Sequence, residues 1–186
     1  MVTGVQTCAL PIYLGLKKKV TNFLMGMDCH LTVFPASTSA EEILRHNPNG
    51  IVITNGPGNP ADVPEVIETV KALMGKKPML GFCMGHLVMA LANGAEATKM
   101  KFGHHGNQPV KGLETGRVYI SAQNHGYVVD AASLEGKDIT LTHVALNDGT
   151  VEGLKYEGKN ALSVQFLPDG EHAYLLKSFV DMMEGR

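Results

Sequence analysis

The sequence predicts a single α/β domain with a mostly parallel central sheet, helices on both faces and antiparallel additions. Short apolar runs alternate with helical patterns through the first half of the chain, which is typical of a parallel sheet. After Lys99 the runs are short and extended and are separated by Gly, Asn and Asp, which favours antiparallel strands. The length of 186 residues suits one ordinary domain.

The expected elements of the first half follow from apolar spacing and from helix-start signals. Apolar residues recur at helical spacing over 16–27, and Ser39 with Glu42 has the form of a capping box. Asp62 with Glu65 repeats that form after the turn formers of 55–60. In chain order we expect a helix over 16–27, a strand over 31–35, a helix from Ser39, a strand over 51–54, a helix from Asp62, a strand over 79–82 and a helix over 85–93.

The second half contains shorter extended segments and one closing helix. The four runs expected to be antiparallel strands cover 118–122, 140–146, 151–156 and 162–166. A final helix is expected over about 172–183, where Leu175, Phe179 and Met182 fall on one face.

Composition excludes several classes of partner. The net charge is -2 with both signs scattered, so a basic face for nucleic acid is missing. No apolar run approaches the roughly 18 residues of a membrane helix. The three cysteines, Cys8, Cys29 and Cys83, are an odd number at irregular spacing, which argues against a disulfide framework and favours a reducing, cytoplasmic location.

The segment Gly81-Phe-Cys83-Met-Gly85 has the form of a nucleophile elbow. The flanking glycines permit a sharp turn between a strand and a helix, and a helix N-terminus lowers the pKa of a thiol. Its backbone N–H groups also stabilise an oxyanion. The alternative for a single cysteine is a small buried core residue, which the two glycines and the strand–helix context disfavour.

Four strings in order carry a resemblance to a known family. GFCMGH (81–86) and TNGPGNP (54–60) resemble the nucleophile motif and oxyanion loop of the class I glutamine amidotransferases. MKFGHHGNQPVKGLETGRVYISAQNHGYVVD (100–130) and HVALNDGTVEGL (143–154) are similar to the glutaminase domains of carbamoyl-phosphate synthase small chains. The resemblance runs from about Leu14 to the C-terminus.

The resemblance implies hydrolysis of glutamine to glutamate and ammonia through a thioester on Cys83. The ammonia would pass to a separate large chain that makes carbamoyl phosphate from bicarbonate and ATP, for arginine or pyrimidine synthesis. The resemblance implies no cofactor in this domain, with ATP and metal expected on the large chain.

The resemblance also assigns the remaining site residues. Backbone N–H groups of Gly58 and Met84 would hold the oxyanion, and Gly56 would shape that loop. The residues assigned to the glutamine pocket are Leu87, Asn124, Gly126 and Tyr127, with Leu87 standing where the family has a glutamine.

The sequence departs from the family at the general base. The family motif VQ-aromatic-His-Pro-acid reads here Val164-Gln-Phe-Leu-Pro-Asp169, so Leu167 occupies the histidine position while Asp169 keeps the place of the catalytic acid. Leucine cannot accept or deliver a proton. Two hypotheses follow: a slow enzyme with a surrogate base, for which His125 is the best candidate, or a non-catalytic interaction module or fragment.

Two further interpretations of the site residues are less well supported by the sequence. A cysteine hydrolase of the α/β-hydrolase kind would pair Cys83 with Asp148 and a late histidine. The adjacent His104 and His105 have no third ligand at metal spacing, so the sequence predicts no metal site.

For domain organisation we expect residues 1–12 to be an aberrant leader and 13–186 to be the glutamine amidotransferase domain. The segment VQTCALPI (5–12) resembles translated sequencing-adapter sequence. The upstream domain of the family's small chain is missing from this sequence, and Tyr13 replaces the acidic residue that ends the family's first strand, which puts that strand in doubt.

Overall fold

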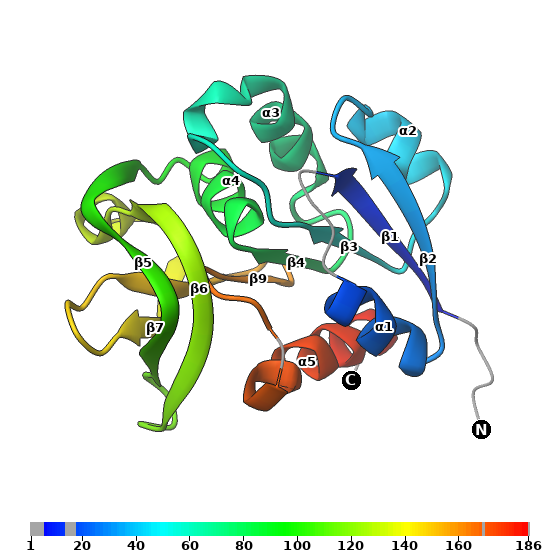
Figure 1. Cartoon of the computed structure of the whole chain (residues 1–186). Helices are drawn as coiled ribbons and strands as arrows, with labels where there is room; N and C mark the ends of the chain where they lie inside the picture. The colour runs from blue at the N-terminus through cyan, green and yellow to red at the C-terminus, as the bar shows by residue number, and fades with distance from the viewer. Residues whose placement is uncertain (1–5, 14–17, 169, 186) are drawn as a thin grey trace.

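The computed structural model describes residues 6–13, 18–168 and 170–185, and for 6–13 it describes the backbone. Within these residues the strands form one nine-stranded sheet in the order β2-β1-β3-β4-β9-β8-β7-β5-β6 (Figure 1). The parallel part comprises β2 (Cys29–Pro35), β1 (Gln6–Tyr13), β3 (Gly50–Ile53), β4 (Met79–Phe82) and β9 (Ala161–Val164). The antiparallel part comprises β8 (Val151–Tyr156), β7 (Ile139–Ala145), β5 (Ala97–Gly112) and β6 (Val118–Val129).

Helices cover both faces of the parallel part, which confirms the predicted fold class (Figure 1). One face carries α2 (Ala40–Arg45), α3 (Pro64–Leu73) and α4 (Met84–Ala92), and the other carries α1 (Lys18–Gly26) and α5 (Ala173–Glu184). Three 3₁₀ turns, η1 (Pro60–Asp62), η2 (Ala131–Leu134) and η3 (Gly170–His172), connect elements. None of the described helices is long and apolar enough to cross a membrane.

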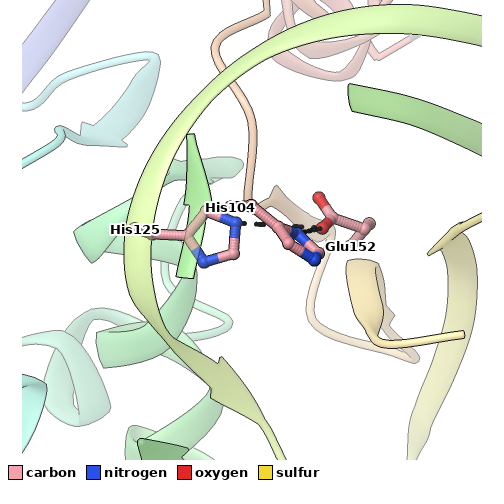
Figure 2. Close-up of side chains that lie close together, drawn as sticks. All are labelled: His104, His125 and Glu152. Carbon is pink, nitrogen blue, oxygen red and sulfur yellow. Dashed lines mark hydrogen bonds and ion pairs between the residues drawn. The ribbon is translucent and has the colours of Figure 1, made fainter. Parts of the chain in front are cut away.

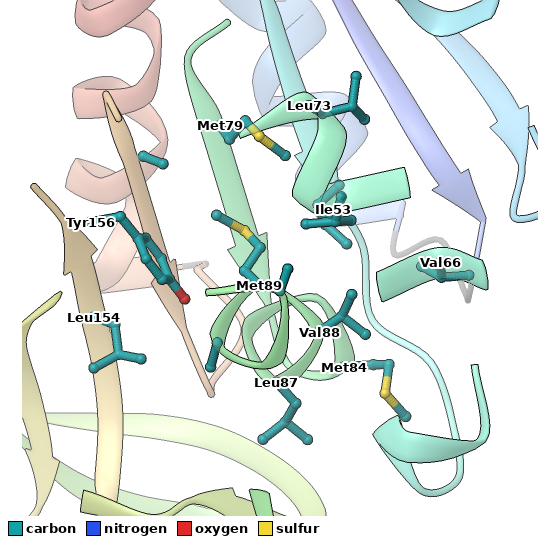
Figure 3. Packing of buried hydrophobic residues seen from close by; sticks show 14 of the residues in the cluster. Ile53, Val66, Leu73, Met79, Met84, Leu87, Val88, Met89, Leu154 and Tyr156 are labelled. Atoms are coloured by element: carbon teal, nitrogen blue, oxygen red, sulfur yellow. The ribbon is translucent and has the colours of Figure 1, made fainter. Parts of the chain in front are cut away.

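The central strands are buried on both faces because their side chains alternate between two hydrophobic clusters. Ile51 and Ile53 of β3 pack in the cluster under α3 and α4, whereas Val52 packs in the cluster under α1 and α5. Figure 3 shows Ile53 together with Val66 of α3 and Val88 of α4 in the first of these clusters. This packing fixes the position of α4 over the carboxyl end of β4.

Two expectations about elements were wrong, and a third was confirmed only in part. The long strand β5 was not predicted at all. The segment expected as an antiparallel strand over 162–166 forms β9, which is antiparallel to β8 as expected but parallel to β4 on its other side. The third helix begins at Pro64 and not at Asp62, because proline, with no N–H and a fixed φ, suits the first helical position; its N-cap Val63 makes no side-chain cap hydrogen bond. By contrast, Ser39 caps α2 as predicted, since its hydroxyl accepts from the Glu42 N–H at 3.2 Å.

Strand β1 falls almost wholly within the segment expected to be a leader. Its backbone pairs in parallel with β2 on one side and with β3 on the other. The first strand, which the sequence left in doubt, is therefore present and separates β2 from β3.

Candidate active site

Cys83 lies at the junction of β4 and α4 in a sharp turn that glycines make possible. Its backbone has φ 55° and ψ -115°, a conformation that non-glycine residues rarely adopt. A Cβ at Gly85 would overlap the carbonyl oxygen of Ile53, and one at Gly81 would lie 2.8 Å from the carbonyl oxygen of Gly85. Both positions of the predicted elbow therefore require glycine because of close backbone approach.

The half-buried Cys83 faces a cavity of about 100 Å³. The cavity is lined by Gly56, Pro57, Gly58, Cys83, Met84, Leu87, Asn124, His125, Gly126, Tyr127 and Gln165. All the predicted site residues except Asp169 lie on this lining, and Asp169 lies outside the described residues. Segments far apart in the sequence thus meet at one place: the loop after β3, the start of α4 and the middle of β6.

Two segments that can supply backbone N–H groups line the same cavity as Cys83. The glycine loop after β3 brings Gly56 and Gly58 to the cavity, with Gly58 at φ 95°, a value that favours glycine. Met84 is the first residue of α4, whose initial N–H groups have no partner within the helix and carry the positive end of its dipole. The arrangement can stabilise negative charge that develops beside the sulfur.

Leu167 does not belong to the cavity. Its half-buried side chain packs against the hydrophobic cluster that includes Val164, Phe166 and Leu176. The residue at the family's base position therefore contributes packing and no proton acceptor.

His125, the proposed surrogate base, lines the cavity but both of its ring nitrogens bind other groups. Nδ1 lies 2.9 Å from the carbonyl oxygen of Tyr127, and Nε2 lies 2.7 Å from Oε1 of Gln123. Burial lowers the pKa of His125 to about 4. These contacts and this pKa make His125 a poor acceptor for a thiol proton at neutral pH.

Gln165 is a cavity residue that the sequence did not predict. It is buried, and neither Oε1 nor Nε2 of its amide has a hydrogen-bond partner among the described residues. Buried polar groups are nearly always paired, so an unpaired amide at the cavity wall is suited to a polar ligand. Its only signal in the sequence is its place in the VQ string that precedes Leu167.

His86 lies behind the elbow and not on the cavity. Its Nδ1 is 2.8 Å from Oγ of Ser163, which in turn is 3.0 Å from the hydroxyl of Tyr156. Burial, and then the neighbouring His125, lower the pKa of His86 to about 3. This buried chain of hydrogen bonds joins α4 to β8 and β9.

Asp148 does not fit the α/β-hydrolase interpretation. Its carboxylate lies 2.9 Å from Nε2 of His104 on β5, and Asp148 does not line the cavity of Cys83. The late histidine of that interpretation, His172, is buried against Phe166 and Tyr119. The pairing expected of a Cys–His–Asp hydrolase is therefore not formed by these residues.

The segments that resemble the class I glutamine amidotransferases thus lie together at one cavity, at the carboxyl end of the central strand β4. The chain belongs to this family: the model for "Glutamine amidotransferase class-I" matches residues 10–178. Among curated proteins it is 48% identical over 178 residues to the carbamoyl phosphate synthase small chain of Listeria monocytogenes, covering 92% of this chain and 49% of that one. It is 50% identical over 176 residues to the small chain of Bacillus cereus, covering 91% and 48%. The chain spans about half the length of these relatives.

Solved structures share the fold at low sequence identity. A protein from Thermoplasma acidophilum described as a putative GMP synthase component superposes with a TM-score of 0.84 at 18% identity, covering 98% of this chain and 96% of that one. A glutamine amidotransferase from Thermotoga maritima superposes with a TM-score of 0.70 at 17% identity, covering 97% and 83%. Both support the α/β fold class.

Proposed function

We propose that this chain is a glutaminase domain of the carbamoyl-phosphate synthase small-chain type, in which Cys83 attacks the side-chain amide of glutamine. The observation that carries the proposal is that Cys83, the glycine loop of Gly56 and Gly58, and the β6 segment from Asn124 to Tyr127 line one cavity. The resemblance of 48–50% identity to small chains supports the same substrate.

In the first step the sulfur of Cys83 adds to the amide carbon of glutamine. Backbone N–H groups of Gly58 and Met84 hold the oxyanion, and the carbon–nitrogen bond then breaks. The thiol proton leaves with the amide nitrogen as ammonia, and a γ-glutamyl thioester stays on Cys83. Water attacks this thioester in the second step, which returns the thiol and releases glutamate.

Both proton transfers lack the family's imidazole, since Leu167 stands at its position. General acid–base catalysis contributes on the order of 10²–10⁴ in rate, so turnover is expected to be lower by about that factor. This observation favours a second function for the chain, that of an impaired module that binds glutamine and a partner. In either case we propose that the partner is a large chain that receives ammonia and carries ATP and metal. A cytoplasmic location and a role in arginine or pyrimidine synthesis are further predictions.

The proposal is tested by separating covalent reaction at Cys83 from turnover. The purified chain is incubated with glutamine while ammonia is measured, and separately with a chloroketone analogue of glutamine while the intact protein mass is followed. We expect one analogue per chain, on Cys83, with ammonia release near the background rate.

The controls are Cys83→Ala, which is expected to abolish labelling, and Cys29→Ala, which removes a buried thiol of the core and is expected to leave labelling intact. A folded chain that the analogue does not label would contradict the glutaminase proposal. Rapid, Cys83-dependent ammonia release would instead show that the chain does not need a base at position 167.

A further inference from the structure

A cluster of metal-ligating side chains lies beside the glutamine cavity and shares one residue, His125, with the cavity wall. His104 of β5, His125 of β6 and Glu152 of β8 are all buried, and their ligand atoms lie within 4.8 Å of one another (Figure 2). His104 and His125 are directly paired across β5 and β6. We propose that these three residues, with the side-chain oxygen of Gln123, form a binding site for a divalent metal ion, best suited to zinc.

The outer nitrogen of each imidazole is held by an acceptor. Nε2 of His104 lies 2.9 Å from a carboxylate oxygen of Asp148, and Nδ1 of His125 lies 2.9 Å from the carbonyl oxygen of Tyr127. The form of each ring that suits a metal ion carries its proton on this outer nitrogen, so that the inner nitrogen presents a lone pair. A carboxylate or a carbonyl on the far nitrogen is the usual outer partner of a zinc-bound histidine.

The orientation of Gln123 is fixed by its own donors. Its Nε2 donates to Oγ of Ser121 and to Oε2 of Glu152, each at 3.0 Å. Its Oε1 therefore faces the two rings, 3.1 Å from Nδ1 of His104 and 2.7 Å from Nε2 of His125.

With Glu152 ionised and both rings protonated on their outer nitrogens, the atoms that converge at the centre are all acceptors. Oε1 of Glu152 lies 3.2 Å from Nδ1 of His104 and 3.9 Å from Nε2 of His125. Two lone-pair nitrogens and two oxygens thus face one another, an arrangement that a cation converts from repulsion to attraction. A tetrahedral zinc ion with bonds of about 2.0–2.1 Å places its ligands about 3.3 Å apart, near the separations observed.

The charge of the cluster also calls for a cation. Glu152 is 0% exposed, and in the described part of the chain only His104 and His125 lie within ion-pair distance of it. When Glu152 is ionised and both rings are neutral, this buried carboxylate has no counter-charge unless a cation or a proton is bound, and such a charge is costly. Two imidazoles and one carboxylate are a donor set that suits zinc, and the bound ion together with Asp148 leaves the site close to neutral.

Zinc at this site ties β5, β6 and β8 together behind the strand that lines the cavity. His125 stands between Asn124 and Gly126, both of which line the cavity of Cys83. His125 itself lines that cavity, but the proposed hydrolysis assigns no step to any of the metal ligands, so we assign the site a structural role. Sequence spacing could not find it, because His104, His125 and Glu152 are each separated by about twenty residues or more and meet only through strand pairing.

The test measures metal binding by the full chain. The chain is stripped with a chelator, supplied with zinc, passed through a desalting column and analysed for bound metal, and cobalt(II) is titrated in parallel while visible absorption is recorded. We expect one zinc per chain, a higher melting temperature with zinc, and the intense visible bands of tetrahedral cobalt. No retained zinc and no thermal shift in the folded chain overturn the proposal, because Glu152 is then satisfied by a proton.

Variants identify the ligands. Glu152→Gln is expected to weaken zinc binding at least a hundredfold. Asp148→Asn, which changes the outer partner of His104, is expected to weaken zinc binding by about tenfold. The second variant keeps the test valid if the first does not fold. His105→Gln is the matched control, since that ring is exposed and bonds Asn124 on the other side of the strand. Cys83→Ala is expected to retain zinc. Loss of zinc by either control, or unchanged affinity in both ligand-side variants, overturns the assignment.

Discussion

At the scale of single residues, Cys83 combines an unfavourable backbone with a position that exposes its sulfur to the cavity. Residues held at positive φ outside glycine cost roughly 1–3 kcal/mol and persist where the surrounding structure requires them. Here the hydrogen bond from the Cys83 N–H to the carbonyl oxygen of Val164, at 2.9 Å, holds the turn against β9. The strain is consistent with a nucleophile that the fold presents to a substrate.

Leu167→His tests the missing base directly. The imidazole would supply a proton acceptor at the family's position, so glutamine hydrolysis is expected to rise. We expect a gain of about tenfold, less than the 10²–10⁴ typical of a well-placed base, because the side chain at 167 packs in the cluster with Phe166 and Leu176. Steady-state ammonia release measures the gain.

Leu167→Asn is the matched control for this variant. Asparagine is polar and of similar size but has no titratable nitrogen, so no gain is expected. Equal activation by both substitutions would show that loosened packing at position 167, and not proton transfer, limits the parent chain.

Residue-scale features could be predicted where they are local in sequence. The elbow needs only Gly81, Cys83 and Gly85 at alternating positions. The structure places these residues at the junction of β4 and α4, as expected. Gln165 could not be selected, because its importance depends on its burial and on its amide having no hydrogen-bond partner among the described residues. Glu152 could not be selected, because its importance depends on its convergence with residues of other strands. The residues adjacent to Gln165 and Glu152 in the sequence indicate neither property.

At the scale of elements, the join between β4 and α4 depends on how closely α4 approaches β3. Gly85→Ala places a methyl group against the carbonyl oxygen of Ile53, which is backbone and cannot rotate away. We expect a loss of about 2–3 kcal/mol in the free energy of unfolding, as for other overpacked sites, together with reduced labelling of Cys83. Chemical denaturation followed by circular dichroism measures the loss.

Gly26→Ala is the matched comparison for that substitution. Gly26 ends α1, and a Cβ there would meet nothing within 4 Å. Alanine favours helix over glycine by about 1 kcal/mol at most, so stability is expected to stay the same or rise slightly. A similar loss in both variants would mean that close approach to Ile53 is not what demands glycine at position 85.

Elements in which apolar residues recur at regular spacing were predictable from the sequence, and elements without such spacing were not. β4 and β8 were expected over the residues that they occupy. β5 was missed because its sequence, ATKMKFGHHGNQPVKG, contains three glycines and a proline, residues depleted in strands, and only pairing with β6 and β7 holds it extended. The parallel direction of β9 also depends on a long-range partner, β4.

At the scale of the whole molecule, buried histidines link stability to pH. Burial lowers the pKa of His86 to about 3 from 6.5, so His86 is neutral in the folded chain and takes up a proton on unfolding below pH 6.5. Its contribution to stability is complete above pH 6.5 and falls by up to about 1.4 kcal/mol per pH unit as the pH drops toward 3. Burial likewise lowers the pKa of His143 to about 4, with the same sign.

Glu152 acts in the opposite direction. Burial, and then the charge of Asp148, raise the pKa of Glu152 from 4.5 to about 8, so in the metal-free chain the folded state holds a proton that the unfolded state releases. Its contribution is complete below pH 4.5 and is lost as the pH rises through 8. The contributions of the histidines and of Glu152 to the pH dependence of stability therefore partly cancel. A single curve of stability against pH for the parent chain cannot assign the change to one residue.

His86→Gln isolates one member of that sum. Between pH 7 and pH 5 the metal-free parent is expected to lose about 1.5–2 kcal/mol more stability than the variant, because only the parent gains a proton at position 86 on unfolding. Denaturant unfolding at several pH values measures both curves, and the comparison uses their slopes, since the variant also loses the hydrogen bond to Ser163. His143→Gln should flatten the curve over the narrower range that ends near pH 4. Parallel curves of unfolding free energy against pH for the parent and His86→Gln would mean that His86 can take up a proton in the folded chain. The packing of α4 against β8 and β9 would then leave His86 more accessible to water than its complete burial implies.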